Sequence, residues 1–229
     1  MTESQIIKRV KTIMKNLPDC PENPIDINAN IVKPFIATEN IDLIIVGLDP
    51  TVRKKDRTKN PKIAFNLDYN ADKDDALKKY AYQLCVGLGV SLENVYVTNL
   101  FKYSYTTPPT KTIDVLYKHL EPNLQLLKEE LSAYPDCPVI IVGEPLLKLL
   151  THCWSNVRAY WSYRVTTIDE RCFFFIKESQ NKLGRRAFPF PCQTALKKEF
   201  YQNTIDDYMA FMKKAVFLMN VFDLTKDSI

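Results

Sequence analysis

An acidic residue follows the most apolar run of the chain. Asp49 comes three residues after the run Leu43–Val46, and Pro50 follows it directly. Branched apolar residues that end at Gly, Asp and Pro are typical of a buried strand followed by a sharp turn. Open α/β sheets bind ligands at the carboxyl ends of such strands. There a carboxylate orients water and offsets the positive charge that develops on a sugar during glycosidic cleavage. The alternative is that Asp49 only caps a turn.

A second apolar run ends in a side-chain amide. Asn99 closes the run Val95–Thr98, and an amide carries the donor and the acceptor that match the polar edge of a pyrimidine. Phe65, in another short apolar segment, offers a ring on which a base can stack. An acid, an amide and an aromatic ring are the groups that a base-flipping enzyme needs. The competing role for Asn99 is a hydrogen bond to backbone at a strand end.

Clusters of basic residues indicate contact with phosphate. The segment 52–62 holds six bases and one acid, Asp56, and it follows Asp49 directly. A solvated surface loop is the usual explanation of such a segment, but its place behind a candidate site favours phosphate contact. A partner that carries phosphate is therefore expected. The candidate contacts are Arg53, Lys54, Lys55, Lys102, Arg185 and Arg186, of which the last two could also simply keep their loop soluble.

Several kinds of site lack support in the sequence. It contains no G-x-G-x-x-G, no G-x-x-x-x-G-K-[ST] and no G-x-S-x-G, so dinucleotide, P-loop and serine-hydrolase functions lose their main signal. No two of the six cysteines are spaced as C-x-x-C, and only His119 and His152 could join them. We expect no metal and no organic cofactor, and we expect reduced, mostly buried thiols.

Composition is that of an ordinary soluble globular protein. The chain has 229 residues, of which 46% are hydrophobic and 25% charged, with a net charge of +4. No apolar run is long enough to cross a bilayer, and the segment Met1–Lys15 lacks the core of a signal peptide. We expect a cytoplasmic monomer without a membrane partner.

The order of the elements that position these side chains favours an α/β fold. Apolar runs at 43–46, 94–102 and 138–145 alternate with amphipathic segments, and strands are also expected at 164–168 and 172–176. Helices are expected at 3–17, 72–88 and 113–133, and a helical region at 195–221. We predict a single domain over 1–229, a three-layer α/β/α sandwich around a mainly parallel four-stranded sheet. Asp49, Asn99 and a loop at 189–194 should meet at its carboxyl edge.

The order of these motifs resembles that of the uracil-DNA glycosylase superfamily. Residues 47–51, Gly-Leu-Asp-Pro-Thr, are similar to its water-activating loop. Residues 64–66, Ala-Phe-Asn, resemble the segment that stacks on the flipped uracil, and 95–102 resemble the strand whose Asn recognises the pyrimidine. Residues 139–144 resemble the next core strand, so the resemblance covers about 41–201. It implies a glycosylase that hydrolyses the N-glycosidic bond of a flipped pyrimidine in DNA, with Asp49 activating water, Asn99 reading the base and Phe65 stacking on it.

Two positions depart from the family pattern. Its last motif is His-Pro-Ser, whose His stabilises the departing base, and the counterpart here is Cys192-Gln193-Thr194. A shift that places Phe188 or Phe190 at the His position stays open. Cys192 is thus the candidate for the role of the His, although a thiol is a weaker hydrogen-bond donor than imidazole. The alternative is that Cys192 is a small buried residue that only fills space in the core. Thr51 beside Pro50 replaces a Tyr that excludes bulky pyrimidines. Both changes favour a larger or modified pyrimidine as the substrate.

The segment after Cys192 carries two further candidate DNA contacts. Leu196 stands where the family inserts a Leu into the base stack, and Thr194 lies between them. The alternative is that Leu196 packs the last helix. Two other functions stay open for the whole protein: a DNA-binding module that has lost catalysis with its His, and an α/β enzyme that acts on a free nucleoside or nucleotide. Repair of deaminated cytosine and defence against DNA with unusual bases are both possible settings.

Overall fold

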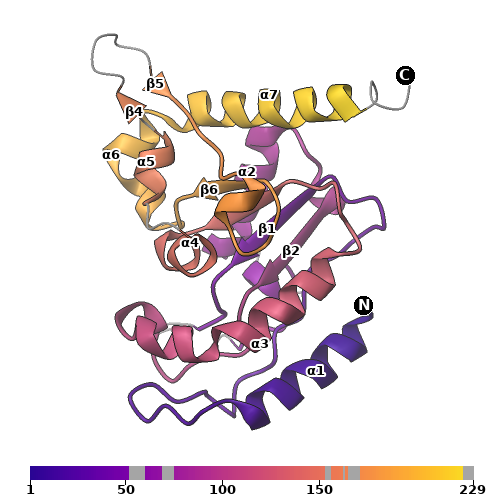
Figure 1. Ribbon diagram of the computed structural model, residues 1–229, viewed down its shortest axis with the longest axis vertical. Helices are drawn as coiled ribbons and strands as arrows, with labels where there is room; N and C mark the ends of the chain where they lie inside the picture. The colour runs from indigo at the N-terminus through magenta and orange to yellow at the C-terminus, as the bar shows by residue number, and fades with distance from the viewer. Residues whose placement is uncertain (52–59, 69–74, 153–155, 162, 165–170, 224–229) are drawn as a thin grey trace.

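Four parallel strands form the central sheet, in the order β2-β1-β3-β6 (Figure 1). This computed structural model describes residues 1–51, 60–68, 75–152, 156–161, 163–164 and 171–223. The strands are β1 (Leu43–Gly47), β2 (Val95–Asn99), β3 (Val139–Val142) and β6 (Ala187–Phe190). Because all four run in the same direction, their carboxyl ends meet at one edge of the sheet. We call this edge the carboxyl edge and the opposite one the amino edge.

Helices cover both faces of the sheet. Helices α1 (Glu3–Asn16) and α3 (Ile113–Leu131) pack together on one face, and α2 (Ala76–Leu88) and α7 (Ile205–Asp223) pack together on the other (Figure 1). The shorter helices are α4 (Glu144–Leu150), α5 (Val157–Trp161) and α6 (Glu199–Gln202). The three-layer α/β/α sandwich with a parallel four-stranded sheet is therefore confirmed. Among the described residues, no helix combines the length and the apolar character that crossing a membrane requires.

The sheet is the centre of the core because its strands are apolar on both faces. Ile44, Ile45 and Val46 of β1 are each 0% exposed. A strand that shows water neither face has no reason to alternate polar and apolar residues, which explains its continuous apolar run. The helices add leucines and aromatic rings at helical spacing, such as Leu120 and Leu127 of α3.

Helix boundaries follow local capping signals. Helix α1, expected over 3–17, ends at Asn16, and Thr2 caps its first turn in a reciprocal bond with Gln5. Helix α2 begins at Ala76 because the Asp75 carboxylate accepts bonds from the backbone of Leu77 and Lys78. Residues 72–74 of the expected helix lie outside the described part. The expected helical region 195–221 is divided into the short 3₁₀ segment Ala195–Lys197, α6 and α7.

The fourth strand of the sheet is a correction to the sequence analysis. Residues 189–194 were expected as a loop, but Pro189 and Phe190 belong to β6, where Pro189 pairs with Ile141 of β3. Proline suggests a turn because it cannot donate to a strand ladder. It is tolerated here because β6 is the last strand of the sheet and needs ladder bonds on one side only.

The strands expected at 164–168 and 172–176 are not part of the central sheet. The described residues of this region form a short antiparallel pair, β4 (Tyr163–Arg164) and β5 (Arg171–Cys172). Residues 165–170 lie outside the described part. Beyond β5, Ile176 makes an isolated bridge with Ala187 at the start of β6.

Candidate active site

An amide from the end of β2 and an aromatic ring from the 3₁₀ segment Ala64–Asn66 meet at the glycine that ends β1. Gly47 and Asn99 are direct partners in the parallel ladder. A Cβ atom added to Gly47 would lie 2.4 Å from Asn99 Oδ1 and 2.6 Å from Phe65 Cε2. Real Cβ atoms do not approach other atoms so closely, so only glycine leaves room for both side chains. We call Gly47, Phe65 and Asn99 the strand-end cluster.

The side-chain amide of Asn99 has no hydrogen-bond partner among the described residues, although only 4% of the residue is exposed. Its backbone carbonyl is engaged, because it accepts a bond of 2.9 Å from Lys102 Nζ. The described part of the chain thus offers no sign of the strand-end role that competed with base recognition. Among the described residues, the fully buried side-chain atoms without a hydrogen-bond partner are Asn123 Oδ1 and Glu130 Oε1, so the Asn99 amide keeps contact with solvent. It can therefore bond to a polar partner from outside the chain.

Phe65 is held in an unusual backbone conformation. Its φ is 54° and that of Asn66 is 58°, both in the left-handed region that non-glycine residues rarely adopt. The Asn66 amide donates a bond of 2.8 Å to Asp75, which caps α2, and Ala64 donates its N–H to the Lys33 carbonyl. Strained positions of this kind cost about 1–3 kcal/mol each and occur preferentially at functional sites.

Tyr80 connects the Phe65 segment with the chain that follows β6. Its ring is stacked on that of Phe65, with centroids 6.4 Å apart and planes 15° apart. Its hydroxyl donates a bond of 2.6 Å to the Pro191 carbonyl, next to Cys192. Burial raises the pKa of Tyr80 well above its ordinary value, and the neighbouring Cys192 adds to this. The sequence analysis missed Tyr80, whose only signal was its place on the buried face of α2.

Asp49 lies two residues beyond Gly47, at the carboxyl edge of the sheet. Its Oδ2 accepts a bond of 2.9 Å from the Thr51 N–H, and Thr51 Oγ1 accepts one of 2.8 Å from the Tyr105 N–H. Asp49 therefore does cap a turn, but this accounts for only one oxygen of its half-buried carboxylate. Burial raises the pKa of Asp49 to about 6, against the opposing effect of the bonds from Thr51. A carboxylate that titrates near neutrality is suited to general base chemistry.

Neither histidine supplies an imidazole at this edge. His119 is 1% exposed, and its Nδ1 lies 3.1 Å from the Tyr105 hydroxyl while its Nε2 lies 3.1 Å from the Pro18 carbonyl. A carbonyl only accepts, so Nε2 carries the proton and Nδ1 accepts from Tyr105. Burial lowers the pKa of His119, which favours the neutral ring. His152 follows α4, which runs back from the carboxyl edge to the amino edge.

Cys192 is exposed, so its interpretation as a buried filler is wrong. Its Sγ lies 3.5 Å from Thr194 Oγ1, and its Cβ would lie 3.6 Å from a Cβ at Gly143, just beyond β3. Cys192 thus lies at the carboxyl edge, as does the exposed Thr194. Leu196 is half-buried and packs against the core, as in the alternative for this residue.

Lys102 is a correction to the predicted DNA contacts. The residue is 1% exposed, and its ammonium lies 2.7 Å from Glu130 Oε1 and donates bonds to Thr98 Oγ1 and the Asn99 carbonyl. These partners use the donors of the ammonium, and burial keeps it from any phosphate outside the protein.

Arg185 and Arg186 lie at the edge of the sheet opposite to Asp49. They precede β6, at the amino edge of the sheet. The Arg185 guanidinium donates to the carbonyls of Leu131, the last residue of α3, and of Tyr134 just beyond it. A basic side chain is favoured at the carboxyl end of a helix. Arg186 lies 3.6 Å from a Glu178 carboxylate oxygen. Arg53, Lys54 and Lys55 lie outside the described residues.

Two lysines that the sequence analysis missed are better placed than Arg185 and Arg186 to contact phosphate near Cys192. Lys197 and Lys198 are exposed and follow Leu196 directly, within the segment that Cys192 begins. Their signal in the sequence was this position, three and four residues after the expected end of the last motif. Nearby, the Arg158 guanidinium lies 4.3 Å from the centre of the Phe200 ring.

Comparison with known proteins adds no assignment. No protein-family model matches the chain, and no curated protein matches it significantly. Within the described residues, no group of three or more His, Cys, Asp or Glu side chains is arranged to hold a metal ion. The chemistry of the site therefore has to be argued from its geometry.

Proposed function

We propose that the protein is a DNA glycosylase of the uracil-DNA glycosylase type, which removes uracil or a modified pyrimidine flipped out of DNA and leaves an abasic site. One observation carries this proposal: the Asn99 amide and the Phe65 ring meet over Gly47, the last residue of β1, and Asp49 follows Gly47 by two residues. A pyrimidine needs a polar edge contact and a stacking face at once, and its sugar needs a nearby anion.

Each residue has a role in the proposed reaction. Asn99 bonds the polar edge of the base and Phe65 stacks on its face. The Asp49 carboxylate orients a water whose oxygen bonds to the anomeric carbon while the bond from that carbon to the base nitrogen breaks. The base leaves with the bonding electron pair and takes a proton, and the water gives up its proton to Asp49 or solvent. Asp49 also offsets the positive charge on the sugar, which requires its ionised form.

The proposed substrate is a pyrimidine that is larger than uracil or modified. Thr51 is smaller than the Tyr that limits ring size in the family, and its hydroxyl is bonded to the Tyr105 N–H. The exposed Cys192 thiol is a weaker donor than imidazole, so a base that leaves more easily than uracil is the better substrate. Removal of such bases fits either repair or defence against DNA that carries them.

DNA is the proposed partner, bound by a monomer in the cytoplasm and without a cofactor. Thr194, Lys197 and Lys198 are exposed beside Cys192 and would contact the phosphates that flank the flipped nucleotide. Lysine contacts of this kind make affinity depend on salt, so binding should weaken as the salt concentration rises.

Single-turnover cleavage of oligonucleotides tests the proposal. Single and double strands with uracil or a 5-substituted uracil are incubated with wild type, Asp49→Asn and Asn99→Ala. The matched controls are Asp42→Asn and Asn94→Ala, because Asp42 and Asn94 precede the same two strands and bond to each other at the amino edge. We expect abasic product from wild type and both controls, and a loss of about 10²-fold or more in the site variants. No product on any substrate would contradict the proposal.

A DNA-binding module without catalysis is the second candidate. This candidate is favoured because neither histidine can stabilise a departing base at the carboxyl edge. His119 is buried with both nitrogens engaged, and His152 follows the end of α4. This candidate predicts salt-dependent binding of the same oligonucleotides with no abasic product. A third candidate, an enzyme acting on free nucleosides, predicts release of base from a deoxynucleoside at a rate that DNA does not exceed.

A further inference from the structure

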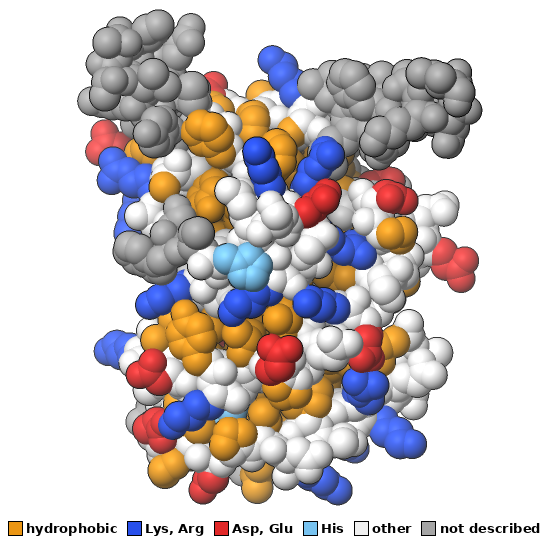
Figure 2. Space-filling model, viewed as in Figure 1, with side chains coloured by type: hydrophobic (Ala, Val, Ile, Leu, Met, Phe, Trp, Pro, Cys, Tyr) orange, Lys and Arg blue, Asp and Glu red, His pale blue; other side chains and the backbone are white. Residues whose placement is uncertain are grey.

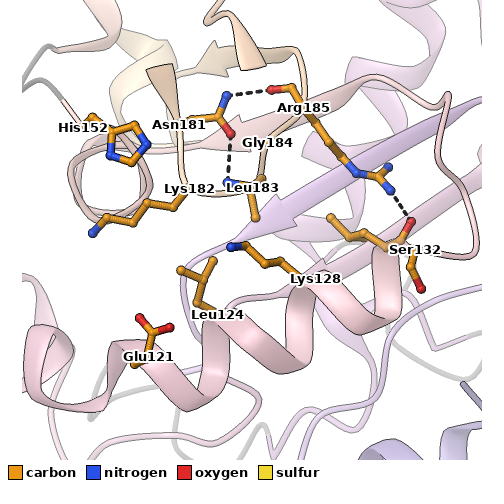
Figure 3. Close-up of a pocket in the computed structure, with 11 residues that line it drawn as sticks. Glu121, Leu124, Lys128, Ser132, His152, Asn181, Lys182, Leu183, Gly184 and Arg185 are labelled. Carbon is orange, nitrogen blue, oxygen red and sulfur yellow. Dashed lines mark hydrogen bonds between the residues drawn. The ribbon is translucent and has the colours of Figure 1, made fainter. Parts of the chain in front are cut away.

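A hollow of the surface lies at the amino edge. It has a volume of about 540 Å³ and lies between the second half of α3, His152 after α4, and the loop 181–185 before β6 (Figure 3). None of its lining residues takes part in the strand-end cluster or its neighbourhood. We call it the amino-edge pocket.

Hydrogen bonds between its walls hold the pocket in shape. The Asn181 side chain is buried, donates to the carbonyls of Lys177 and Arg185, and accepts from the Leu183 N–H. The loop is tied to α4 by a bond of 2.7 Å from the Lys182 N–H to the Leu150 carbonyl. It is tied to α3 by the bonds of Arg185 to the end of that helix. A pocket preformed in this way loses little conformational entropy when a ligand binds.

The charge of the pocket is mainly positive. Lys128 extends from α3 and Lys182 from the loop toward the same opening, with the Glu121 carboxylate below them (Figure 3). Among the described residues, neither lysine forms an ion pair, whereas the Arg185 guanidinium is used by the helix carbonyls. Figure 2 shows the same pattern on the surface, where basic side chains surround an exposed histidine. An anionic group between the two lysines would meet both charges.

Three leucines lie beneath these charges. Leu124, Leu131 and Leu183 line the pocket and are 3%, 1% and 7% exposed. The leucines are already almost fully buried, so it is the volume of about 540 Å³ that indicates the size of the ligand. Inorganic phosphate alone would fill only a small part of this volume. A ligand that fits carries an anionic group for the lysines and an organic part that fills the rest. A nucleic acid held at the carboxyl edge would have to cross the whole sheet to reach this pocket.

We infer that the amino-edge pocket binds a small phosphate ester. Its phosphate lies between the amino groups of Lys128 and Lys182, and His152 lies at the rim as a further donor. Its organic part fills the remaining volume of the pocket. The site is independent of the proposed glycosylase site, since the two lie at opposite edges of the sheet and share no residue.

Titration of the ¹⁵N-labelled protein with adenosine 5′-monophosphate tests this inference by nuclear magnetic resonance. A purine nucleotide is chosen because a pyrimidine nucleotide would also probe the carboxyl edge. Adenosine and inorganic phosphate are titrated separately, because adenosine supplies only the organic part of the ligand and inorganic phosphate only the anionic part. The test variant is Lys128→Gln with Lys182→Gln, and the matched control is Lys8→Gln with Lys11→Gln, two exposed lysines of α1.

We expect saturable shifts of the amides of 128 and 182–184, with the nucleotide binding more tightly than either half. The double pocket variant should weaken binding by roughly tenfold or more, since each lysine supplies a charge-assisted contact, and the control should not. Unchanged affinity in the pocket variant, or shifts at other residues only, would overturn the inference. It would also be overturned if the nucleotide caused no shift while a single-stranded oligonucleotide shifted these same amides, because the pocket would then belong to a nucleic-acid surface.

Discussion

Lys102 and Glu130 form an ion pair inside the protein, with 2.7 Å between Nζ and Oε1 and side chains that are 1% and 0% exposed. Lys102 belongs to the chain just after β2, and Glu130 to the last turn of α3. The other carboxylate oxygen, Oε2, accepts bonds from the Tyr96 and Thr98 hydroxyls, and Lys102 also donates to the Asn99 carbonyl. The pair therefore fixes the end of the strand that carries Asn99.

Replacing Lys102 should destabilise the protein strongly. Lys102→Met leaves the Glu130 carboxylate buried without its counter-charge, and we expect a loss of about 3–5 kcal/mol in the free energy of unfolding. Urea denaturation at pH 7 measures it. Adding Glu130→Leu removes the uncompensated charge and should recover most of the loss. A single variant as stable as wild type, or a double variant no better than the single, would contradict a buried pair.

The Lys102–Glu130 pair also shows which contacts could not be predicted from the sequence. The apolar runs of β1 and β2 and the spacing of α1 and α3 depend on local pattern, and they were predicted to within a few residues. The side-chain direction of Lys102 depends on Glu130 in a helix far along the chain, which no local pattern contains. A lysine three residues after Asn99 therefore suggested phosphate contact when it is part of the core.

Partners distant in sequence explain the other errors. Arg185 was predicted to bind DNA because basic residues in a loop usually face solvent, but its guanidinium donates to the carbonyls of Leu131 and Tyr134 instead. Pro189 suggested a loop because the sequence does not say which strand lies at the edge of a sheet. In the site, Asp49 and Asn99 were found through their position after apolar runs. Tyr80 was missed because its partners, Phe65 and Pro191, come together only in the fold.

The rate of base removal should depend on the ionisation of Asp49. Burial raises the pKa of Asp49 to about 6, and the proposed reaction needs the carboxylate. The single-turnover rate should be constant above pH 7 and fall as pH drops through 6, reaching roughly a tenth of its plateau at one unit below the pKa. A pH series of cleavage rates measures this. A rate that stays flat down to pH 4.5 would exclude Asp49 as the ionised group.

Asp49→Asn should stabilise the fold while it abolishes cleavage. In the unfolded chain this carboxyl titrates near 3.8 and in the folded protein near 6, so the folded state binds its proton more tightly. The free energy of unfolding of wild type therefore falls as pH rises from 4 to 6. Asn avoids this loss, which is about 1–3 kcal/mol for a half-buried group.

The difference in unfolding free energy between Asp49→Asn and wild type should thus be larger at pH 7 than at pH 4. Denaturation at both pH values measures it, and Asn keeps an oxygen that can accept the Thr51 N–H. An equal difference at the two pH values would mean that the environment of Asp49 does not disfavour its charge. A variant that is stabilised and inactive would be typical of a residue kept for function at a cost in stability.

Gly47→Ala should damage substrate binding more than stability. The new Cβ would lie 2.4 Å from Asn99 Oδ1, the end of a side chain that can rotate away, and 2.6 Å from the Phe65 ring. We expect cleavage to fall by about 10²-fold, because base contacts depend on sub-ångström placement, and stability to fall by about 1–3 kcal/mol from overpacking.

Gly184→Ala is the matched control for this glycine. Gly184 has a φ of +65°, so alanine is strained there, but nothing lies within 4 Å of the added Cβ. It should therefore cost stability of about 1 kcal/mol and leave cleavage unchanged. If both variants lost cleavage in proportion to stability, the strand-end cluster would have no special part in binding.

Tyr80→Phe should loosen the segment that carries Cys192. The variant keeps the ring that stacks on Phe65 but loses the hydroxyl that donates 2.6 Å to the Pro191 carbonyl. We expect a loss of about 1–2 kcal/mol in stability, faster alkylation of Cys192 by iodoacetamide, and slower cleavage. Mass spectrometry of the alkylated peptide measures the second effect at Cys192 itself. The control is Tyr82→Phe, because Tyr82 lies on the same helix and is 59% exposed. This control should leave stability, alkylation and cleavage unchanged. Equal alkylation in wild type and Tyr80→Phe would mean that Tyr80 does not position this segment.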